Sequence, residues 1–386
     1  MFENTQIAFA SKSDSALRKA NFLFLILKWN KLANIGIYLL KIAIKFALPI
    51  KLLIKKTIFS QFCGGESIAE CLSVMNSLNE YRINTILDYA VEAESNEITA
   101  KKNLHIFKKL ILIDAEKEEI RFSVIKITSI LNLEILQKLQ QKEELTKEQS
   151  EQYYKTVSAL HELFELAQQN NVKLMIDAEE SWIQSSIDSI AIEGMKKYNT
   201  NTATLFNTYQ MYRKDQLNVL AQDILNAKNN GYQLGIKLVR GAYLEKEKAR
   251  AIEYNYPNPI CDSKEATDQQ FDEALKLCIE YIDTIELCCG SHNEESNAYL
   301  TKLLDNARLA KNNKKVFFAQ LYGMSDHISY NLANMGYNVA KYLPFGPVKS
   351  VIPYLIRRAQ ENKSIAGQSG RELSLINQEI KRRRYS

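Results

Sequence analysis

Two adjacent arginines, Arg357 and Arg358, are the residues whose types and spacing point most directly to chemistry. A guanidinium group binds a carboxylate through two parallel hydrogen bonds, so the pair suits a small anionic substrate. Tyr354 and Glu361 share their helical stripe, because residues three, four and seven positions apart lie on one face of a helix. Taken alone, however, two arginines on a helix are more typical of exposed ion pairs, which contribute little.

Two other charged residues lie in apolar surroundings. Lys126 is inside the run Val124–Ile127, and Asp177 directly follows Leu174–Ile176. Burying a charge without a partner is costly, so a functional role explains both residues better than a place in the core. Tyr342, at the end of another apolar run, could by itself simply pack against its neighbours.

Eight short apolar runs rich in β-formers are expected to position these residues. Between most of them lie longer segments with apolar residues at helical spacing, such as Ser150–Gln169 and Ala266–Thr284. Strands that alternate with helices predict a parallel sheet, and eight such units predict a closed (β/α)8 barrel. The expected strands are Thr85–Val91, Phe122–Ser129, Lys173–Ala178, Ala203–Tyr209, Gly235–Arg240, Ile285–Ser291, Val316–Leu321 and Val339–Tyr342.

Polar residues cluster where seven of these eight runs end. The active site of a (β/α)8 barrel forms at the carboxyl ends of its strands, so the clustering predicts an enzyme. The residues concerned are Lys126, Asp177–Glu180, Asn207–Gln210, Arg240–Tyr243, Ser291–Asn293, Gln320–Met324 and Tyr342.

Three expectations concern the connecting segments. The charge-rich stretch Asn96–Glu118 is expected to be a surface excursion, and Leu131–Gln149 an extra polar helical arm. After the last strand, the turn Pro344–Pro347 is expected to break the chain. Ser350, a residue type favoured at helix N-caps, is then expected to open the final helix.

Positive charge is concentrated at the N-terminus. Residues 1–60 hold ten Lys and Arg and two acids, a balance of +8, so the rest of the chain carries about −3 of the total of +5. No run reaches the ~18 apolar residues of a membrane-spanning helix, and no signal-peptide cleavage pattern follows a single apolar core. Lysines recur near helical spacing at Lys41, Lys45, Lys51 and Lys55.

This pattern favours an amphipathic segment lying on a membrane surface, with Trp29 and Tyr38 at the boundary. The alternative is a set of helices packed on the domain, whose lysines extend into solvent. We therefore expect a basic amphipathic helical segment over residues 1–60, a barrel over 61–375 and a basic tail over 376–386.

The six cysteines show no C-x-x-C pair and no metal-ligand spacing with the four histidines. We expect buried thiols in a reducing compartment and no metal site. None of the thirteen glycines falls in a G-x-G-x-x-G pattern, so a Rossmann-type nucleotide site is not indicated.

Taken together, the motifs resemble the proline dehydrogenase family, which are flavin enzymes. The resemblance spans roughly Phe62 to Arg371. It implies an α/β fold: a distorted (β/α)8 TIM-type barrel with an N-terminal helical segment and a final helix over the barrel mouth. The matching motifs are Phe62–Glu66, Leu87–Glu92, Asp177–Glu180, Lys237–Tyr243, His292–Asn293 and the stretch from Tyr342 to Asn362.

The resemblance also implies roles for individual residues. Lys126, Arg357 and Arg358 would hold the substrate carboxylate. Asp177 would lie in the floor of the site and orient Lys126 or Tyr342. The residues enclosing the substrate ring would be Tyr243, Leu321 and Tyr342, and those contacting FAD would be Asn207, Lys237, Arg240, Gly241, Ala242, His292, Asn293 and Glu361.

Two of these positions depart from the family pattern. Asn207 stands where the family has a glutamine, and Lys237 where bacterial relatives often have an arginine. Flavin contacts at both positions therefore stay open.

The reaction implied is oxidation of L-proline to Δ1-pyrroline-5-carboxylate by hydride transfer to FAD, with a membrane quinone as the next acceptor. The segment after Arg371 is too short for the aldehyde dehydrogenase domain of bifunctional relatives, so a separate pyrroline-5-carboxylate dehydrogenase is the expected partner. No nucleic acid partner is expected. The expected location is the cytoplasm, at the inner face of the cell membrane, or the mitochondrial inner membrane in a eukaryote.

Three alternatives remain. One is hydroxyproline oxidation, although a bulky Tyr342 would crowd a 4-hydroxyl group. Another is a barrel lyase in which Lys126 forms a Schiff base. The third is a non-catalytic, membrane-bound barrel, which would leave charges at the barrel mouth without a ligand to balance them.

Overall fold

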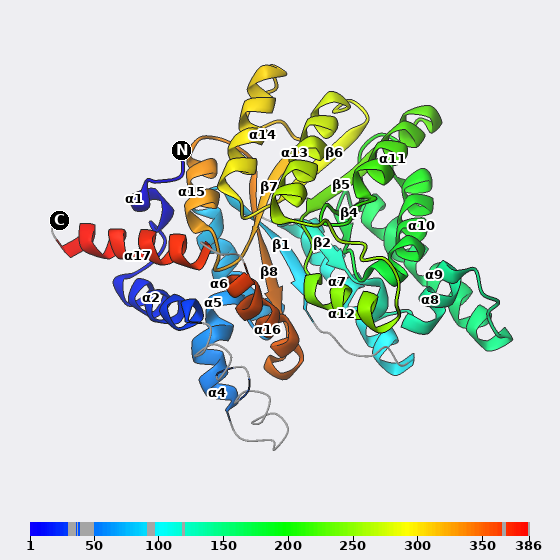
Figure 1. Cartoon of the computed structure of the whole chain (residues 1–386), viewed down its shortest axis with the longest axis horizontal. Helices are drawn as coiled ribbons and strands as arrows, with labels where there is room; N and C mark the ends of the chain where they lie inside the picture. The colour runs from blue at the N-terminus through cyan, green and yellow to red at the C-terminus, as the bar shows by residue number, and fades with distance from the viewer. Residues whose placement is uncertain are drawn as a thin grey trace. The chain divides into compact units, whose positions relative to one another are not determined.

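The computed structural model describes residues 1–29, 36, 38, 50–90, 97–117, 120–364 and 368–384; the side chains of residues 120, 121, 360–364, 368 and 369 lie outside this description. Eight strands close into a barrel in the order β1 to β8, as predicted (Figure 1). The strands are β1 (Ile83–Tyr89), β2 (Ile120–Ile125), β3 (Lys173–Ile176), β4 (Leu205–Gln210), β5 (Leu234–Val239), β6 (Ile285–Gly290), β7 (Val316–Leu321) and β8 (Val339–Phe345).

The chain forms two compact units, Met1–Glu92 with Gln320–Ser386, and Ala93–Ala319. The helices of the first unit are α1 (Thr5–Ala8), α2 (Asp14–Lys28), α4 (Lys51–Ile54), the π-helix η1 (Lys55–Phe59), α5 (Ser60–Phe62), α6 (Ile68–Asn79), α15 (Asp326–Asn334), α16 (Val348–Ser364) and α17 (Gln368–Arg384). Those of the second are α7 (Glu97–Glu116), the 3-10 helix η2 (Ile127–Ser129), α8 (Leu133–Gln141), α9 (Lys147–Gln169), α10 (Ser181–Tyr198), α11 (Gln216–Asn230), α12 (Leu244–Glu253), α13 (Lys264–Glu280) and α14 (Glu294–Asn306).

In the first unit, the N-terminal helices are part of the core. One face of α2 is buried in a cluster that also includes Phe62 and residues of α16 and α17. Phe24 of α2 meets Phe62 edge-on, with 6.4 Å between the ring centroids. α2 therefore packs on its own unit, as the alternative interpretation expected. The buried α2 residues are Leu17, Ala20, Phe24 and Leu27.

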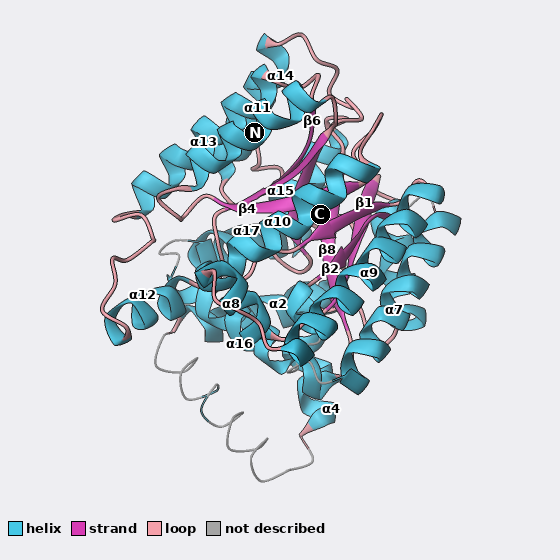
Figure 2. Ribbon diagram, turned by 90° about the vertical axis from the view of Figure 1, so that its right-hand side faces the viewer, coloured by secondary structure: helices cyan, strands magenta, loops and turns pink. Residues whose placement is uncertain are grey.

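In the second unit, the prediction of a surface excursion over Asn96–Glu118 is wrong. The segment forms α7, which packs on β2 through buried Phe107, Leu110 and Ile111. These apolar residues recur at helical spacing, and the many charges occupy the other face. Similarly, α8 is no protruding arm, because it packs against α10 with Ile135 and Leu136 buried. Figure 2 shows α11 and α13 side by side on the outside of the strands of this unit.

The expected break at Pro344–Pro347 also lies elsewhere. β8 continues through Pro344 to Phe345, in parallel register with β1 from Ile83↔Val339 to Tyr89↔Phe345. The carbonyl of Pro344 accepts a hydrogen bond from the Gly64 backbone N–H (2.9 Å). A Cβ on Gly64 would lie 2.8 Å from the Leu343 side chain, so only glycine permits this approach.

The last two helices differ from the sequence expectation as well. α16 begins at Val348 instead of after Ser350, and the Val348 N–H points at the Glu66 carboxylate (3.4 Å). The described residues of the expected tail, 376–384, form the second half of α17, in which Ile376 and Glu379 are buried. The buried-thiol prediction is confirmed for five cysteines, while Cys261 is partly exposed.

Candidate active site

In the second unit, the segment after β3 fixes the turn that follows Lys126. Glu179 accepts a hydrogen bond from the Thr128 backbone N–H (3.0 Å) and another from the Thr128 hydroxyl. The Lys126 carbonyl accepts from the Ser129 hydroxyl (2.6 Å), which closes η2 directly after Lys126. Burial raises the pKa of Glu179 to about 7, although the Thr128 bonds and the nearby Lys126 charge oppose this.

Asp177 forms a buried ion pair with Lys237. The Lys237 Nζ lies 2.5 Å from Asp177 Oδ1, and only 9% and 14% of the two side chains are exposed. The sequence led us to expect that Asp177 orients Lys126 or Tyr342, and it did not indicate Lys237 as a partner. Asp177 directly follows β3 and Lys237 lies within β5, so the pair is a largely buried polar element near the carboxyl ends of these strands.

The structure argues against a flavin contact by Asn207. Its amide is fully buried and donates to Asp188 on α10 (2.8 Å). Tyr209, which shares its strand face, donates to Asp223 on α11 (2.8 Å). Since side chains alternate along a strand, Gln210 lies on the opposite face and donates to the Glu179 carbonyl (2.7 Å). The alternation of side chains along Asn207–Gln210 could have shown from the sequence that Gln210 and Asn207 lie on opposite faces of the strand.

Arg240 is held by the helices behind its strand. It donates to Asp268 (2.6 Å), Ser291 (2.8 Å) and Ser296 (3.0 Å), and its guanidinium stacks on Phe271 at 4.4 Å. Burial disfavours a charged Asp268, yet the bonds and charges of Lys264 and Arg240 together lower its pKa. The charge of Arg240 is therefore already balanced by an acid, which weakens its assignment as a phosphate ligand.

The glycine after Arg240 is required by its surroundings. Gly241 has φ +136°, and a Cβ there would lie 2.5 Å from the Tyr212 ring. Tyr243 then stands at the N-cap position of α12. That helix is anchored by Glu247, which accepts from the Ser181 N–H (2.7 Å) and hydroxyl (2.5 Å). Residues 177–181 thus contact Lys237 directly, bond Thr128 near Lys126, and anchor the helix that begins after Tyr243.

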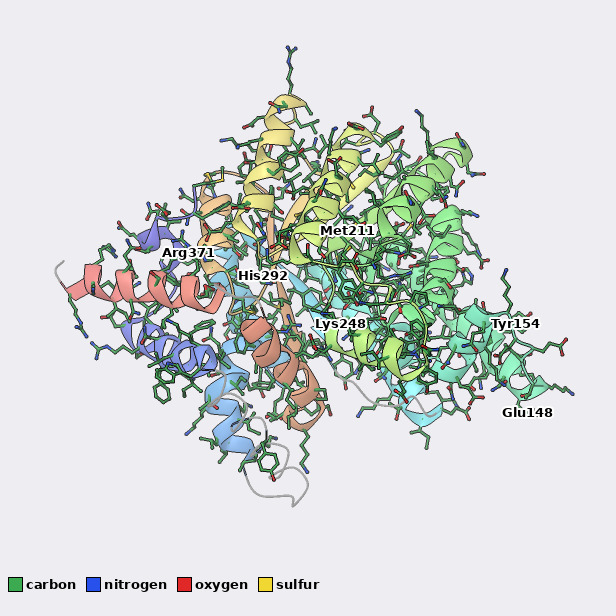
Figure 3. The ribbon with its side chains drawn as sticks, viewed as in Figure 1. Glu148, Tyr154, Met211, Lys248, His292 and Arg371 are labelled. Atoms are coloured by element: carbon green, nitrogen blue, oxygen red, sulfur yellow. The ribbon has the colours of Figure 1, made fainter. Side chains whose placement is uncertain are left out.

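At the end of β6, Asn293 caps α14 by accepting a hydrogen bond from the Ser296 N–H (3.0 Å). His292 directly precedes this cap and is partly exposed; it is labelled in Figure 3. Ala242, in the loop after β5, is exposed. Ala242 is thus exposed and His292 partly exposed at the ends of their strands, whereas the Asn293 side-chain oxygen is engaged by the helix.

In the first unit, a buried charge cluster joins the segment after β7 to β8. Lys341 is fully buried, and its Nζ lies 2.8 Å from Asp326 and 2.6 Å from the Met324 carbonyl. Asp326 also pairs with Lys12 from the N-terminal segment (3.0 Å). Burial alone would keep Asp326 neutral, but the two lysines hold its pKa well below its ordinary value. No sequence pattern predicted this cluster.

The predicted substrate residues of this unit lie on β7, β8 and α16. Leu321 ends β7 and is partly exposed, and Tyr342 on β8 is 8% exposed. Arg358 on α16 is 6% exposed and stacks on the Tyr354 ring at 5.0 Å; Arg357 beside it is partly exposed. A buried, stacked guanidinium differs from the exposed ion pair that two helical arginines suggested. The Glu361 side chain lies outside the described residues.

The motif Phe62–Glu66 supports α16 and β8. Glu66 binds Lys55 (2.9 Å) and Lys51 (2.9 Å) as well as lying near the Val348 N–H. These bonds, led by that of Lys55, lower the pKa of Glu66 to about 2. A carboxylate at a helix N-terminus is favourable, so this motif helps to fix the start of the helix that carries Arg357 and Arg358.

Charged and polar side chains at the carboxyl ends of the strands of a closed (β/α)8 barrel define the chain as a barrel enzyme. The family model described as proline dehydrogenase matches residues 71–371. The mitochondrial proline dehydrogenase 1 of Dictyostelium discoideum is 32% identical over 382 residues, covering 87% of this chain and 67% of that protein. The chain belongs to the proline dehydrogenase family and is an oxidoreductase.

Two further similarities bear on fold and specificity. A hydroxyproline dehydrogenase of Xenopus laevis is 29% identical, covering 86% of this chain and 79% of that protein. The crystal structure of proline utilization A (PutA) from Bdellovibrio bacteriovorus, inactivated by N-propargylglycine, superposes with a TM-score of 0.75 at 20% identity. It covers 93% of this chain and 38% of the PutA chain, and it supports the barrel fold.

Several relatives are longer than the region of similarity. The chain spans 37% to 40% of the length of the matched proline dehydrogenases of Caenorhabditis elegans, Drosophila melanogaster and Homo sapiens.

Proposed function

We propose that this protein oxidises L-proline to Δ1-pyrroline-5-carboxylate with bound FAD. The observation that carries the proposal is the burial of Arg358, which stacks on Tyr354 beside Arg357 in a member of this family. An arginine placed in a desolvated position suits a bidentate carboxylate ligand. Arg357 and Arg358 bind the substrate carboxylate, and Lys126 contributes a further positive charge.

The substrate ring is enclosed by Tyr243, Leu321 and Tyr342. These apolar and aromatic surfaces exclude water from the ring carbon that reacts, while the arginines fix its orientation. The ring nitrogen must be neutral for its neighbouring carbon to release hydride. The oxidation rate therefore rises with pH as the amine loses its proton.

The buried pair of Asp177 and Lys237 supports a cofactor next to the ends of β3 and β5. A lysine donor beside a carboxylate fits the polar edge of an isoalloxazine ring, and His292, Gly241 and Ala242 complete the residues proposed to hold FAD. When bound, FAD accepts the hydride. Lys237 would supply a hydrogen bond donor to it, and Asp177 orients that lysine.

The electrons pass on to a membrane quinone, and the product passes to a separate pyrroline-5-carboxylate dehydrogenase. We place the protein at the inner face of the cell membrane, or at the mitochondrial inner membrane in a eukaryote. The basic, apolar N-terminal region supports this location.

Visible spectra of the purified protein test the proposal. Under anaerobic conditions, L-proline bleaches the flavin absorbance, and one pyrroline-5-carboxylate forms per flavin reduced. A colourless protein would contradict FAD binding. Borohydride trapping of a substrate adduct on Lys126, without bleaching, would instead support the Schiff-base alternative.

Hydroxyproline is the second candidate substrate, because the Xenopus relative is a hydroxyproline dehydrogenase. The bulk of Tyr342, which is 8% exposed on β8, favours proline. Tyr342→Ser should raise kcat/KM for hydroxyproline, relative to that for proline, about tenfold or more, because it removes a steric block. An unchanged ratio would show that Tyr342 does not select the ring.

A further inference from the structure

Helix α2 is apolar on two opposite faces. Its inner face is buried in the core of its unit, through Leu17, Ala20, Phe24 and Leu27. Its outer face carries Phe22 and Leu25, which are 65% and 44% exposed, and Trp29, the C-cap residue directly after the helix, is 62% exposed. Phe22 and Leu25 follow Arg18 at intervals of four and three positions, so these three residues lie on one stripe, and Trp29 follows at its end.

A helix that packs on a domain normally turns polar residues to solvent. Single exposed apolar residues are common, but a stripe of large ones on a single helix indicates a surface that binds something. In the same unit, Leu52 and Leu53 of α4 are also exposed, at 69% and 65%. No described helix is long and apolar enough to cross a membrane.

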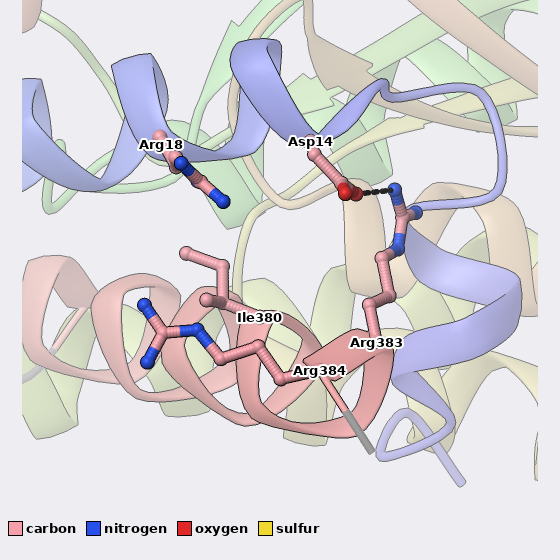
Figure 4. Close-up of a pocket in the computed structure, with 5 residues that line it drawn as sticks. All are labelled: Asp14, Arg18, Ile380, Arg383 and Arg384. Atoms are coloured by element: carbon pink, nitrogen blue, oxygen red, sulfur yellow. Dashed lines mark hydrogen bonds and ion pairs between the residues drawn. The ribbon is translucent and has the colours of Figure 1, made fainter. Parts of the chain in front are cut away.

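Positive charge borders the apolar stripe. α17 packs antiparallel to α2, since Asn21 bonds to Asn377 (2.7 Å) and Arg383 to Asp14 (2.9 Å). The two helices form a small pocket, into which Arg18 and Arg384 extend on either side of Ile380 (Figure 4).

The acid in this pocket, Asp14, is already paired with Arg383. Over the described ranges of the chain, Arg18 and Arg384 have no acidic partner, and neither has Lys28 at the end of α2. Two arginines lining one pocket, without a carboxylate to balance them, suit a phosphate group.

The lysine repeat in the sequence is a poorer candidate for this role. Lys51 pairs with Glu66 (2.9 Å), and Lys55 pairs with Glu66 (2.9 Å) and Glu70 (3.0 Å). Lys41 and Lys45 lie outside the described residues. Of these lysines and the basic residues around the pocket, those without an acidic partner in the described part of the chain therefore lie on α2 and α17.

We propose that Arg18, Phe22 and Leu25 of α2, its C-cap residue Trp29 and Arg384 of α17 form a docking face for an anionic phospholipid membrane. The arginines bind lipid phosphates, and the three apolar side chains enter the interfacial layer, where tryptophan is favoured. The charge on the face selects an anionic bilayer over an uncharged partner. The inference rests on the proposed membrane quinone, because it names the surface that brings the enzyme to that acceptor.

Deletion of the N-terminal residues is not a clean test, because Phe9 and Phe24 belong to the core. Surface variants avoid this problem. In co-sedimentation with vesicles of phosphatidylcholine, with or without 30% phosphatidylglycerol, we expect the protein to bind the anionic vesicles. Since each basic residue near a lipid surface contributes ~1 kcal/mol, Arg18→Gln with Arg384→Gln should weaken binding roughly 30-fold.

The triple variant Phe22→Ser, Leu25→Ser, Trp29→Ser should weaken binding to the same vesicles at least about tenfold. Matched controls are Ile98→Ser with Ile252→Ser, which are both 82% exposed, and Lys248→Gln with Lys276→Gln, which remove two exposed charges (Figure 3). These controls should bind as the parent does.

Anaerobic flavin reduction by L-proline separates the docking face from the reaction. The docking variants should keep the parent rate of reduction while losing turnover with vesicle-embedded quinone. If the proposed reaction is wrong, the vesicle experiment still tests whether the docking face binds the membrane. The face is refuted if the docking variants bind like the controls. It is equally refuted if they lower Tm or convert an oligomer into monomers, because another part of the chain or a second copy would then cover the stripe.

Discussion

Both carboxylate oxygens of Glu179 accept hydrogen bonds from Thr128, one from its backbone N–H at 3.0 Å and one from its hydroxyl. Thr128 lies two residues after Lys126, in the single turn of η2. The position of Lys126 therefore depends on a residue of the next strand's loop. Glu179 is itself held, because its N–H donates to Gln184 (2.6 Å) and its carbonyl accepts from Gln210 (2.7 Å).

Removing the hydrogen bonds between Glu179 and Thr128 should weaken substrate binding. Thr128→Val keeps the side-chain shape but removes the hydroxyl donor, and Glu179→Gln removes the charge. Because a hydrogen bond to a charged group contributes ~1.5–3 kcal/mol, we expect the KM for proline at about pH 8, where Glu179 is mostly ionised, to rise roughly tenfold or more, with a smaller change in kcat. Steady-state kinetics measure both constants.

The matched control is Glu180→Gln, since Glu180 pairs with an exposed lysine, Lys246, on α12. It should change KM for proline less than twofold. If Thr128→Val and Glu179→Gln act through the same turn, the double variant resembles either single one. If the two changes in KM add fully in the double variant, Thr128 and Glu179 do not act together on the position of Lys126.

Asp177→Asn should destabilise the fold as well as the reaction. Lys237 would lose its ion-pair partner in a largely buried place, and removing one partner of a buried pair costs ~3–5 kcal/mol. The midpoint of urea unfolding reports the loss. The control is Asp215→Asn, which removes an exposed carboxylate, 52% accessible, from Arg213. A surface pair contributes about 1 kcal/mol or less, so equal effects of the two variants would disprove the importance of burial.

Asp114 should make stability depend on pH. It lies on the buried face of α7, and burial raises its pKa to about 7 from 3.8, although the Ser123 hydroxyl bond opposes the rise. The folded protein therefore holds this proton between pH 4 and 7 while the unfolded chain releases it. The contribution of Asp114 to stability falls as pH rises through that window.

Asp114→Asn removes the titrating carboxyl group and with it this fall in stability at higher pH. Relative to the parent, the variant should gain roughly 2–4 kcal/mol in free energy of unfolding between pH 4.5 and pH 8. Urea titrations at several pH values measure the gain. Asp305→Asn, an exposed change on α14, serves as control and should run parallel to the parent. A constant difference between Asp114→Asn and the parent would show that Asp114 ionises normally.

Arg358→Met should abolish proline binding while the fold survives. A methionine retains apolar packing against Tyr354 but cannot bind a carboxylate, so we expect the Kd for proline to rise about 100-fold. Reduction of the flavin by dithionite and the Tm should stay unchanged. Arg382→Met, on α17, is the control. Unaltered proline binding in Arg358→Met would overturn the central substrate assignment.

Lys12 and Asp326 should be strongly coupled. Asp326→Asn removes the carboxylate that pairs with buried Lys341 and partly exposed Lys12, whereas Lys12→Met leaves Asp326 with Lys341 alone. We expect Asp326→Asn to cost ~3–5 kcal/mol and the double-mutant cycle to show a coupling of ~1–3 kcal/mol. Because the pKa of Asp326 is held low, its contribution is present above pH 4 and is lost only in stronger acid. A coupling near zero would show that Lys12 is not part of the cluster.

The strands were readily predicted from the sequence. A strand that is buried on both faces is a continuous run of apolar residues, and such a run is visible without knowledge of the tertiary structure. β7 begins and ends at the predicted residues, and β8 was missed only beyond Tyr342. The breaking effect of Pro344 was overestimated, since its carbonyl bonds to Gly64, a partner 280 positions away. α7 was missed because its charge content concealed the buried stripe of Phe107, Leu110 and Ile111.

The sequence by itself determined the alternation of strands and helices, the polar residues after each strand and hence the barrel and its family. These features follow from local periodicity and from residue types in a fixed order. Only the tertiary structure decided which charges are paired. Lys237 meets Asp177, Arg240 meets Asp268, Lys341 meets Asp326, and Asn207 turns away to Asp188. Pairing depends on distances between residues that are far apart in the chain, so a linear pattern cannot show which charges are already balanced.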